Sequence, residues 1–208
     1  MIRVQTAGDC CTLTLARPDK ANALTEAMLE ALALAATEAA TNGAKVLILT
    51  GEGRVFSAGA DLDGMKAGLG LSPAWEAASA AVAAFPGLSI AALNGTLAGG
   101  AMGVALACDL RIAVPSANFF YPVMRLGYRP QPSDPARLAA LVGPARAKMI
   151  LLAAQKIDAE TALSWGLIDR ICTPEALTDT AMSLAEAALA ADPGHVMALK
   201  RMTDGEAP

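Results

Sequence analysis

The chain has few aromatic residues, few charged residues and a single histidine. Of its 208 residues, 4% are aromatic and 17% are charged, whereas 54% are hydrophobic. With so few aromatic side chains, the core must be built mainly from Ala, Leu, Val, Ile and Met. A chain of this length forms one domain, or one domain with an appendage.

The charge and the hydrophobic pattern exclude several classes of partner. The net charge is −4 with an isoelectric point near 5.0, whereas nucleic-acid-binding proteins usually carry a basic stripe. The N-terminus has no charged segment followed by an apolar one, so we expect no signal peptide. The most apolar window, 89–107, is interrupted by Asn94 and Gly99, whereas a membrane span needs about 20 apolar residues. We therefore expect a cytoplasmic protein that binds neither nucleic acid nor membranes.

The cysteines and the histidine suggest no metal site. Cys10, Cys11, Cys108 and Cys172 lack metal-ligand spacing, and the only histidine is His195. We interpret the cysteines as small buried thiols in a reducing compartment. A Ser–His hydrolase would need His195 within hydrogen-bond reach of a nucleophilic serine, and the sequence contains no nucleophile elbow.

Strands and helices alternate over the first two thirds of the chain. Short apolar runs predict strands within 1–16 and over 46–50, 89–93 and 110–114, and helical spacing predicts helices over 25–42, 73–84 and 100–107. Thr25 is the expected N-cap of the first helix, and Asn42-Gly43 its end. This alternation predicts an α/β core with parallel strands over residues 1–135.

The remainder of the chain, 136–208, is predicted to be a helical C-terminal part. Helices are expected over 136–142, 144–153, 158–165 and 174–190, with a short strand over 168–172. Asp158 is the expected N-cap of the third of these helices, and Gly166 its end.

Two glycine-bearing turns each follow a buried strand. The first is Phe56 to Leu62 and the second Asn94 to Gly103. The second fits neither the dinucleotide-binding glycine pattern nor a phosphate-binding P-loop. The first alone is better explained as a plain strand-to-helix turn. Together they match a pair of backbone N–H donors, which a thioester carbonyl needs if it is to become an enolate.

Four segments resemble the crotonase superfamily, which contains the enoyl-CoA hydratases and isomerases. They are 16–24, 46–62, 90–109 and 158–171, and they occur in the expected order and at the expected intervals. The resemblance implies a crotonase-like spiral of ββα units, trimers or paired trimers, and a role in fatty acid metabolism. It also implies an acyl-CoA thioester substrate, with coenzyme A as part of that substrate and no prosthetic group.

The resemblance also implies roles for particular residues. The positions that match the two oxyanion-hole donors are Ala60 and Gly100. The turn that lines the coenzyme A site matches Lys20, Ala21 and Ala23. The stretch where the adenine and the pantetheine arm lie matches Ala58, Asp61 and Leu62. For Lys20, a solvated turn charge is the alternative to a phosphate contact.

The catalytic carboxylates of the family are absent from the matching positions. Gly103 stands where the hydratases have one glutamate, Val123 where hydratases and isomerases have another, and Gln131 near a third acidic position. Hydration needs one group to activate water and another to deliver a proton, and double-bond migration needs at least one base. A standard hydratase or isomerase activity is therefore not expected.

Other side chains near the acyl pocket are candidates for acid or base. Asp134 is the nearest carboxylate in sequence, although it could instead cap the following helix. Tyr128 and Tyr121 could donate a proton, or could be core residues with tethered hydroxyls. Glu76 could reach the site or face solvent, and Asp61 could simply anchor its loop.

Three functional hypotheses remain open. The first is a crotonase-type enzyme that stabilises an enolate, with decarboxylation as one variant because it needs no base at these positions. The second is a catalytically silent coenzyme A-binding or scaffold protein. For the third, a dinucleotide-binding oxidoreductase, the sequence lacks the glycine fingerprint and the acidic ribose ligand.

The length of the chain bears on the expected trimer. Family members usually continue beyond the position of Lys200 with helices that complete the trimer contact. The subunit is either naturally short or trimmed, and both readings put the trimer in doubt.

Overall fold

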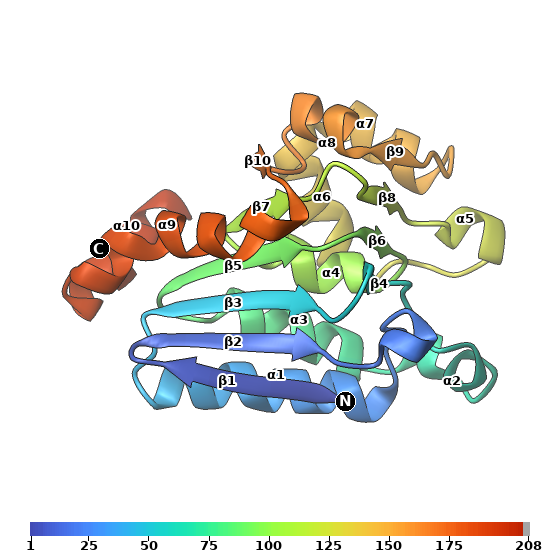
Figure 1. The fold of residues 1–208 in the computed structure, drawn as a ribbon. Helices are drawn as coiled ribbons and strands as arrows, with labels where there is room; N and C mark the ends of the chain where they lie inside the picture. The colour runs from blue at the N-terminus through green and yellow to red at the C-terminus, as the bar shows by residue number, and fades with distance from the viewer. Residues whose placement is uncertain (206–208) are drawn as a thin grey trace.

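The computed structural model describes residues 1–205 and contains two sheets (Figure 1). The larger sheet has the strand order β1-β2-β3-β5-β7-β10, and the smaller has the order β4-β6-β8-β9. The larger sheet is parallel except for the β1–β2 pair, which is antiparallel. In chain order the strands are Ile2–Ala7, Cys10–Leu15, Val46–Gly51, Val55–Ser57, Leu88–Leu93, Thr96–Ala98, Leu110–Ala113, Asn118–Phe120, Ile157–Asp158 and Arg170–Ile171.

Successive strand pairs alternate between the two sheets. β3, β5 and β7 lie in the larger sheet, and each is followed directly by a short strand of the smaller sheet, β4, β6 or β8. Each pair then leads into helical structure. The chain thus repeats a ββα unit, which confirms the crotonase-like spiral implied by the sequence.

The corner between β3 and β4 requires a residue without a side chain. A Cβ atom on Gly51 would lie 2.7 Å from the carbonyl oxygen of Phe56. The side chain of Asn94 braces the same corner, because its Oδ1 accepts from Gly51 N (3.0 Å) and its Nδ2 donates to Gly53 O (2.8 Å). The next ββα unit therefore supports the turn of the preceding one.

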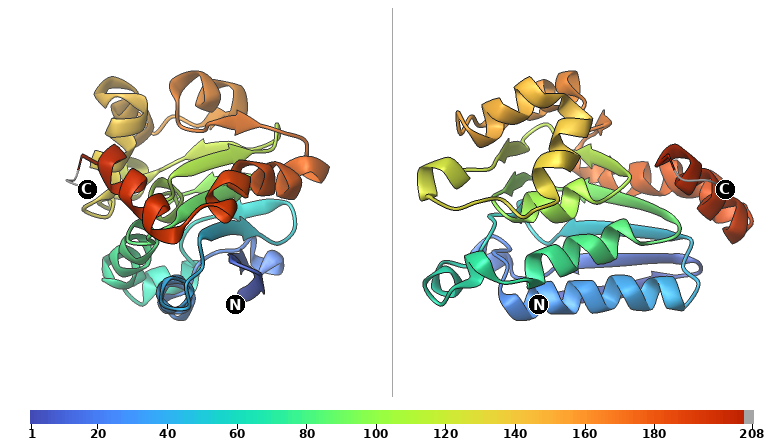
Figure 2. Two further views of the ribbon diagram at one scale, coloured as in Figure 1. Left: turned by 90° about the vertical axis from the view of Figure 1, so that its left-hand side faces the viewer. Right: turned by 180° about the vertical axis from the view of Figure 1, so that it is seen from behind.

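Helices cover both faces of the larger sheet (Figures 1 and 2). α1, α3 and α4 lie on one face and α9 on the other. The α-helices in chain order are Glu26–Thr41, Leu62–Lys66, Ala74–Ala83, Ala101–Leu106, Val123–Leu126, Asp134–Val142, Pro144–Leu151, Ala159–Trp165, Leu177–Ala190 and Pro193–Thr203. Short 3-10 turns, η1 to η3, span Pro18–Lys20, Leu69–Leu71 and Pro174–Ala176. None of the helices within residues 1–205 is long and apolar enough to cross a membrane.

Local signals for helix ends are confirmed where side chains cap them. Thr25 accepts from Met28 N and Asp158 accepts from Thr161 N, and Gly166 ends α8 in the left-handed conformation. Residues 51–64 contain β4 and the start of α2, neither of which was predicted, and α10 was not predicted either. Residues 206–208, the end of the predicted helical C-terminal part, lie outside the described residues.

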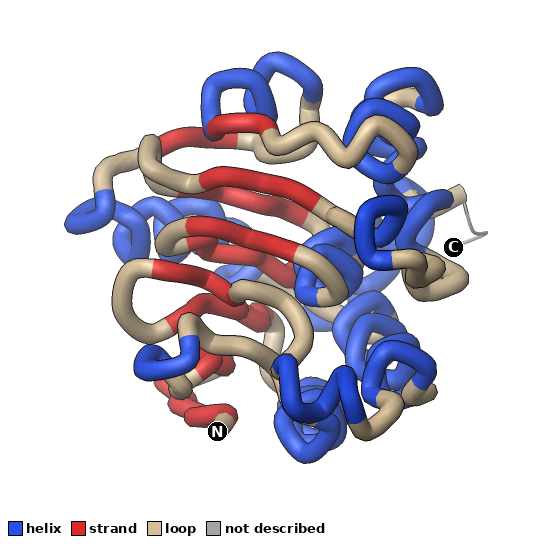
Figure 3. The backbone as a smooth tube through the Cα atoms, turned by 90° about the vertical axis from the view of Figure 1, so that its right-hand side faces the viewer, coloured by secondary structure: helices blue, strands red, loops and turns tan. Residues whose placement is uncertain are grey.

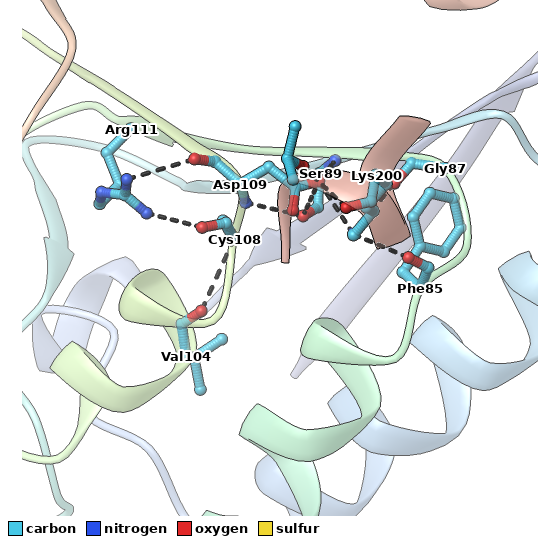
Figure 4. Close-up of polar contacts among 9 residues, drawn as sticks. Phe85, Gly87, Ser89, Val104, Cys108, Asp109, Arg111 and Lys200 are labelled. Carbon is cyan, nitrogen blue, oxygen red and sulfur yellow. Dashed lines mark hydrogen bonds and ion pairs between the residues drawn. The ribbon is translucent and has the colours of Figure 1, made fainter. Parts of the chain in front are cut away.

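The last helix, α10, is fastened to the sheet through one lysine. Lys200 Nζ donates to Phe85 O (2.8 Å) and Gly87 O (3.1 Å), and pairs with Asp109 Oδ2 at 2.9 Å (Figure 4). The same Asp109 oxygen accepts from the backbone N and the hydroxyl of Ser89. Asp109 therefore joins α10 to the start of β5.

Candidate functional site

The two glycine-bearing turns meet beside the smaller sheet. Gly59 has φ +96° and Gly99 has φ +56°, values that favour glycine. A Cβ atom on Gly59 would lie 2.9 Å from the carbonyl oxygen of Ala98, so the turns are in direct contact. Figure 3 looks onto this end of the molecule, where short strands alternate with loops.

The backbone around Ala60 leaves its N–H group free. Gly59 O accepts from Leu24 N (2.7 Å), and Asp61 N donates to Leu24 O (2.9 Å). Both neighbours therefore face Leu24, and the intervening N–H of Ala60 points to the opposite side. Within residues 1–205, the N–H groups of Ala60 and Gly100 donate no hydrogen bond to the protein.

Ala60 and Gly100 both line one mainly apolar pocket of about 170 Å³. Gly100 lies directly against Trp75, because a Cβ atom on Gly100 would lie 2.9 Å from the Trp75 ring. Trp75 is 3% exposed, and its indole N–H donates to Leu69 O at 2.9 Å, so the ring is fixed. The pocket lining comprises Ala58, Ala60, Leu62, Met65, Gly70, Trp75, Gly99, Gly100, Phe120, Tyr121, Pro122, Val123, Leu126, Tyr128, Arg129 and Gln131.

The turn predicted to line a coenzyme A site lies against the first glycine-bearing turn. Ala58 N donates to Ala21 O (2.9 Å), and Ala23 O accepts from the guanidinium of Arg17 (3.1 Å). Lys20 is exposed at the end of η1. The first of these contacts places Ala21 beside Ala58, which lines the pocket.

Asp61 anchors its own loop. Its Oδ2 accepts from Gly64 N at 3.0 Å as the N-cap of α2, and its Oδ1 pairs with Arg17 Nη1 at 2.6 Å. The hydrogen bond from Gly64, followed by that from Arg17, holds the pKa of Asp61 below its ordinary value. The next side chain, Leu62, is 78% exposed at the pocket rim.

Asp134 does not cap a helix, contrary to one of the two sequence interpretations. It is the first residue of α6, follows the N-cap Ser133, and is 1% exposed. Its Oδ2 accepts the hydroxyl proton of Tyr121 at 2.7 Å, whereas its Oδ1 has no hydrogen-bond partner within residues 1–205. Burial raises the pKa of Asp134 to about 6, although the hydrogen bond from Tyr121 opposes the shift.

The Asp134 carboxyl fills the space beside Gly103. A Cβ atom on Gly103 would lie 2.5 Å from Asp134 Oδ1 and 3.0 Å from its Cγ. Gly103 lies three residues after Gly100, and residues at this spacing share one face of a helix. The carboxyl of Asp134, from α6, thus lies where the first side-chain atom of a larger residue at position 103 would stand.

The other candidates are dispersed around the pocket. Tyr128 is 40% exposed and lines it, as do Val123 and Gln131. Glu76 is half-buried, and its Oε2 accepts weakly from Ser133 N at 3.4 Å, so it does not simply face solvent. Trp75 was not predicted as a pocket residue, although a single tryptophan within an alanine-rich helix is a signal that could have identified it.

Comparison with known proteins identifies relatives over nearly the whole chain. Residues 5–207 match the model of the enoyl-CoA hydratase/isomerase family. The chain is 36% identical over 173 residues to "Probable enoyl-CoA hydratase echA6" of Mycobacterium bovis, covering 83% of this chain and 71% of the relative. It is 34% identical over 186 residues to the short-chain-enoyl-CoA hydratase of Clostridium acetobutylicum, covering 86% and 71% respectively.

Solved structures share the fold. Pseudomonas aeruginosa DspI matches with a TM-score of 0.92 at 30% sequence identity, over 98% of this chain and 86% of DspI. A Geobacillus kaustophilus structure described as an enoyl-CoA hydratase subunit matches with a TM-score of 0.89 at 31% identity, over 98% and 81% respectively. From the family match, the identities and the shared spiral of ββα units, the chain belongs to the enoyl-CoA hydratase/isomerase family of the crotonase superfamily.

Proposed function

We propose that this protein binds an acyl-CoA thioester and stabilises the enolate of that thioester through the N–H groups of Ala60 and Gly100. The observation that carries the proposal is that both N–H groups are free of acceptors within residues 1–205 and belong to residues that line the same pocket. Donors fixed before the reaction stabilise a developing oxyanion without reorganisation. Such an arrangement lowers the barrier to forming an enolate.

The coenzyme A arm is proposed to follow the turn beside the pocket. Lys20 is exposed and free to approach a phosphate, and Ala21 and Ala23 lie on the same turn. Ala58, Asp61 and Leu62 continue this surface towards the pocket, with Asp61 acting through its loop contacts. Coenzyme A is then part of the substrate, and the chemistry requires no prosthetic group.

The pocket supports an enolate reaction better than hydration. The two positions that would carry glutamates are Gly103 and Val123, and hydration needs two proton-handling groups. The family relatives named as hydratases are therefore a guide to the substrate class more than to the reaction. Decarboxylation of an acyl-CoA, which needs no base at these positions, is the proposed reaction type, and a silent coenzyme A-binding protein is the alternative that the missing glutamates favour.

A homotrimer or hexamer belongs to the same proposal. Apolar side chains of α10 remain exposed in the single chain, as expected for a helix that meets another subunit; they are Met197, Leu199 and Met202.

The test is calorimetric binding of butyryl-CoA, crotonyl-CoA and malonyl-CoA, with free coenzyme A as reference, followed by product analysis. Gly100→Pro removes the N–H group and suits the backbone, because Gly100 has φ −60°. Gly100→Ala is the matched control, since it introduces the same Cβ near Trp75 but keeps the N–H group.

We expect the wild type to bind thioesters more tightly than coenzyme A, and Gly100→Pro to lose this preference relative to Gly100→Ala. Circular dichroism checks that both variants fold. Binding of free coenzyme A and thioesters with equal affinity, or no binding at all, contradicts the proposal.

A further inference from the structure

A buried carboxyl and a buried phenol lie together behind the oxyanion turns. Tyr121 follows β8 and lines the pocket, and its hydroxyl donates to Asp134 Oδ2 at 2.7 Å. Asp134 begins α6 and lies against α4, on the face that Gly100 and Gly103 share. The pair therefore reaches from the pocket wall to the space that a side chain at position 103 would occupy.

One oxygen of this pair is unsatisfied. Asp134 is 1% exposed, and its Oδ1 has no hydrogen-bond partner among residues 1–205. Burying a carboxylate oxygen without a partner is costly, so the charged form of this carboxyl is disfavoured. Glu76 lies close enough to disfavour the charged form further, and burial brings the pKa of Asp134 to about 6. A carboxyl of this kind exchanges its proton near neutral pH.

We propose that Tyr121 and Asp134 form the proton-transfer pair of this site, with Asp134 as the base in place of the absent glutamates. The inference rests on the proposed acyl-CoA binding. Tyr121 is the residue that touches the substrate, and Asp134 acts through it.

The step balances as a proton relay. The bond between the thioester α-carbon and its hydrogen breaks, and that electron pair becomes the enolate double bond while negative charge moves to the oxygen held by Ala60 and Gly100. The proton passes to the phenolic oxygen of Tyr121 as the phenolic proton passes to Asp134 Oδ2. The carboxylate becomes a carboxylic acid, and the reverse sequence returns a proton to carbon.

A single base of this kind suits a particular set of substrates. It can remove and return one proton, which is sufficient for α-proton exchange or for moving a double bond along the acyl chain. It does not provide the separate acid and base that hydration requires. The chemistry therefore favours acyl-CoA thioesters with an acidic α-hydrogen and no need for an added water molecule.

The test is exchange of the α-hydrogens of butyryl-CoA in deuterated water, followed by mass spectrometry and proton NMR with the full-length protein. Asp134→Asn keeps an acceptor for the Tyr121 hydroxyl but no base, and Tyr121→Phe removes the relay oxygen. Asp179→Asn, an exposed position at the start of α9, is the matched control. Calorimetry with butyryl-CoA and circular dichroism accompany each variant.

We expect both pair variants to lose at least about 100-fold in exchange rate, the lower end for general acid–base groups, while butyryl-CoA affinity and fold are retained. In the wild type, the rate should rise with pH and level off above about pH 6, as Asp134 ionises. Exchange that survives in Asp134→Asn overturns the pair, and exchange lost in Asp134→Asn but kept in Tyr121→Phe overturns the relay.

The failure of the two proposals can be told apart. A wild type that binds butyryl-CoA but shows no exchange overturns the proton-transfer pair and leaves acyl-CoA binding standing. A wild type that does not bind butyryl-CoA at all overturns the proposed function itself, and the pair with it.

Discussion

The guanidinium of Arg17 pairs with the carboxylate of Asp61, with Nη1 2.6 Å from Oδ1. The same nitrogen donates to Ala23 O, and Asp61 also accepts from Gly64 N. Arg17 thereby connects the turn after β2 to the residue that follows Ala60, the proposed oxyanion donor. The position of that donor depends on a contact between segments 44 residues apart.

Arg17→Ala is expected to loosen the turn that carries Ala60. Without the guanidinium, Asp61 keeps only its cap bond, so the N–H of Ala60 is held less firmly and acyl-CoA binding weakens. The melting temperature should fall by roughly 2–4 °C, the usual response of a chain of this size to the loss of one modest interaction. Calorimetric binding and thermal unfolding measure the two effects.

The control for this change is Arg3→Ala. Arg3 pairs with Glu52 at 2.7 Å, but the two side chains are 50% and 40% exposed, and such surface pairs contribute little. Loss of acyl-CoA affinity in both variants to the same extent would show that removal of positive charge, and not loosening of the turn, is responsible.

Much of the fold could be predicted because its signals are local. The buried strands β3 and β5 are apolar runs between glycines or prolines, and Thr25 and Asp158 cap the helices that they were expected to cap. The smaller sheet was missed because its strands are only two or three residues long and have no alternating pattern. These short strands are stabilised by pairing with one another, and that pairing forms only when neighbouring ββα units pack together.

The candidate site was predictable in one part and not in the other. The paired glycine turns follow buried parallel strands, so the sequence alone predicted that they would converge. The contact between Tyr121 and Asp134 depends on how α6 packs against α4, and the Ser-Asp-Pro sequence around Asp134 is equally typical of a helix cap. No local pattern indicates that the Asp134 carboxyl fills the space beside Gly103.

Lys200→Met is expected to release α10 from the sheet. The substitution keeps most of the side-chain length but removes the donor to Phe85 O, Gly87 O and Asp109. Those acceptors lose their partner, which costs about 1–3 kcal/mol of unfolding free energy. Urea unfolding measures the loss, and limited proteolysis should cleave before α10 more rapidly. Lys148→Met, at an exposed position on α7, should change neither.

Gly103→Ala tests the close approach between α4 and α6. The added methyl group would lie 2.5 Å from Asp134 Oδ1, so the carboxyl must move within a packed interior. Overpacking of this kind costs about 1–3 kcal/mol. In an Asp134→Ala background the space is open, and the same substitution should cost little. A double-mutant cycle measured by urea unfolding gives the coupling energy, and equal costs in both backgrounds would show that the two residues do not compete for space.

The raised pKa of Asp134 makes stability depend on pH in a defined direction. Because the folded-state pKa is about 6 and the ordinary value is 3.8, the folded protein holds this proton more tightly than the unfolded chain does. Between about pH 4 and pH 6 the folded state carries more bound protons, so this group's contribution to stability falls as pH rises and is constant above that range. At about 1.4 kcal/mol per pH unit, the ionised carboxyl costs about 3 kcal/mol at pH 8.

Asp134→Asn removes that cost while keeping an acceptor for the Tyr121 hydroxyl. We therefore expect the variant to exceed the wild type in unfolding free energy at pH 8, and this excess to shrink as the pH is lowered to 4.5, because the wild type then takes up its proton. Urea unfolding at half-unit pH steps measures the difference, with Asp179→Asn as an exposed control that should track the wild type throughout. A difference that stays constant from pH 4.5 to 8 would mean that Asp134 does not titrate in this range, and that its buried environment does not favour the neutral acid.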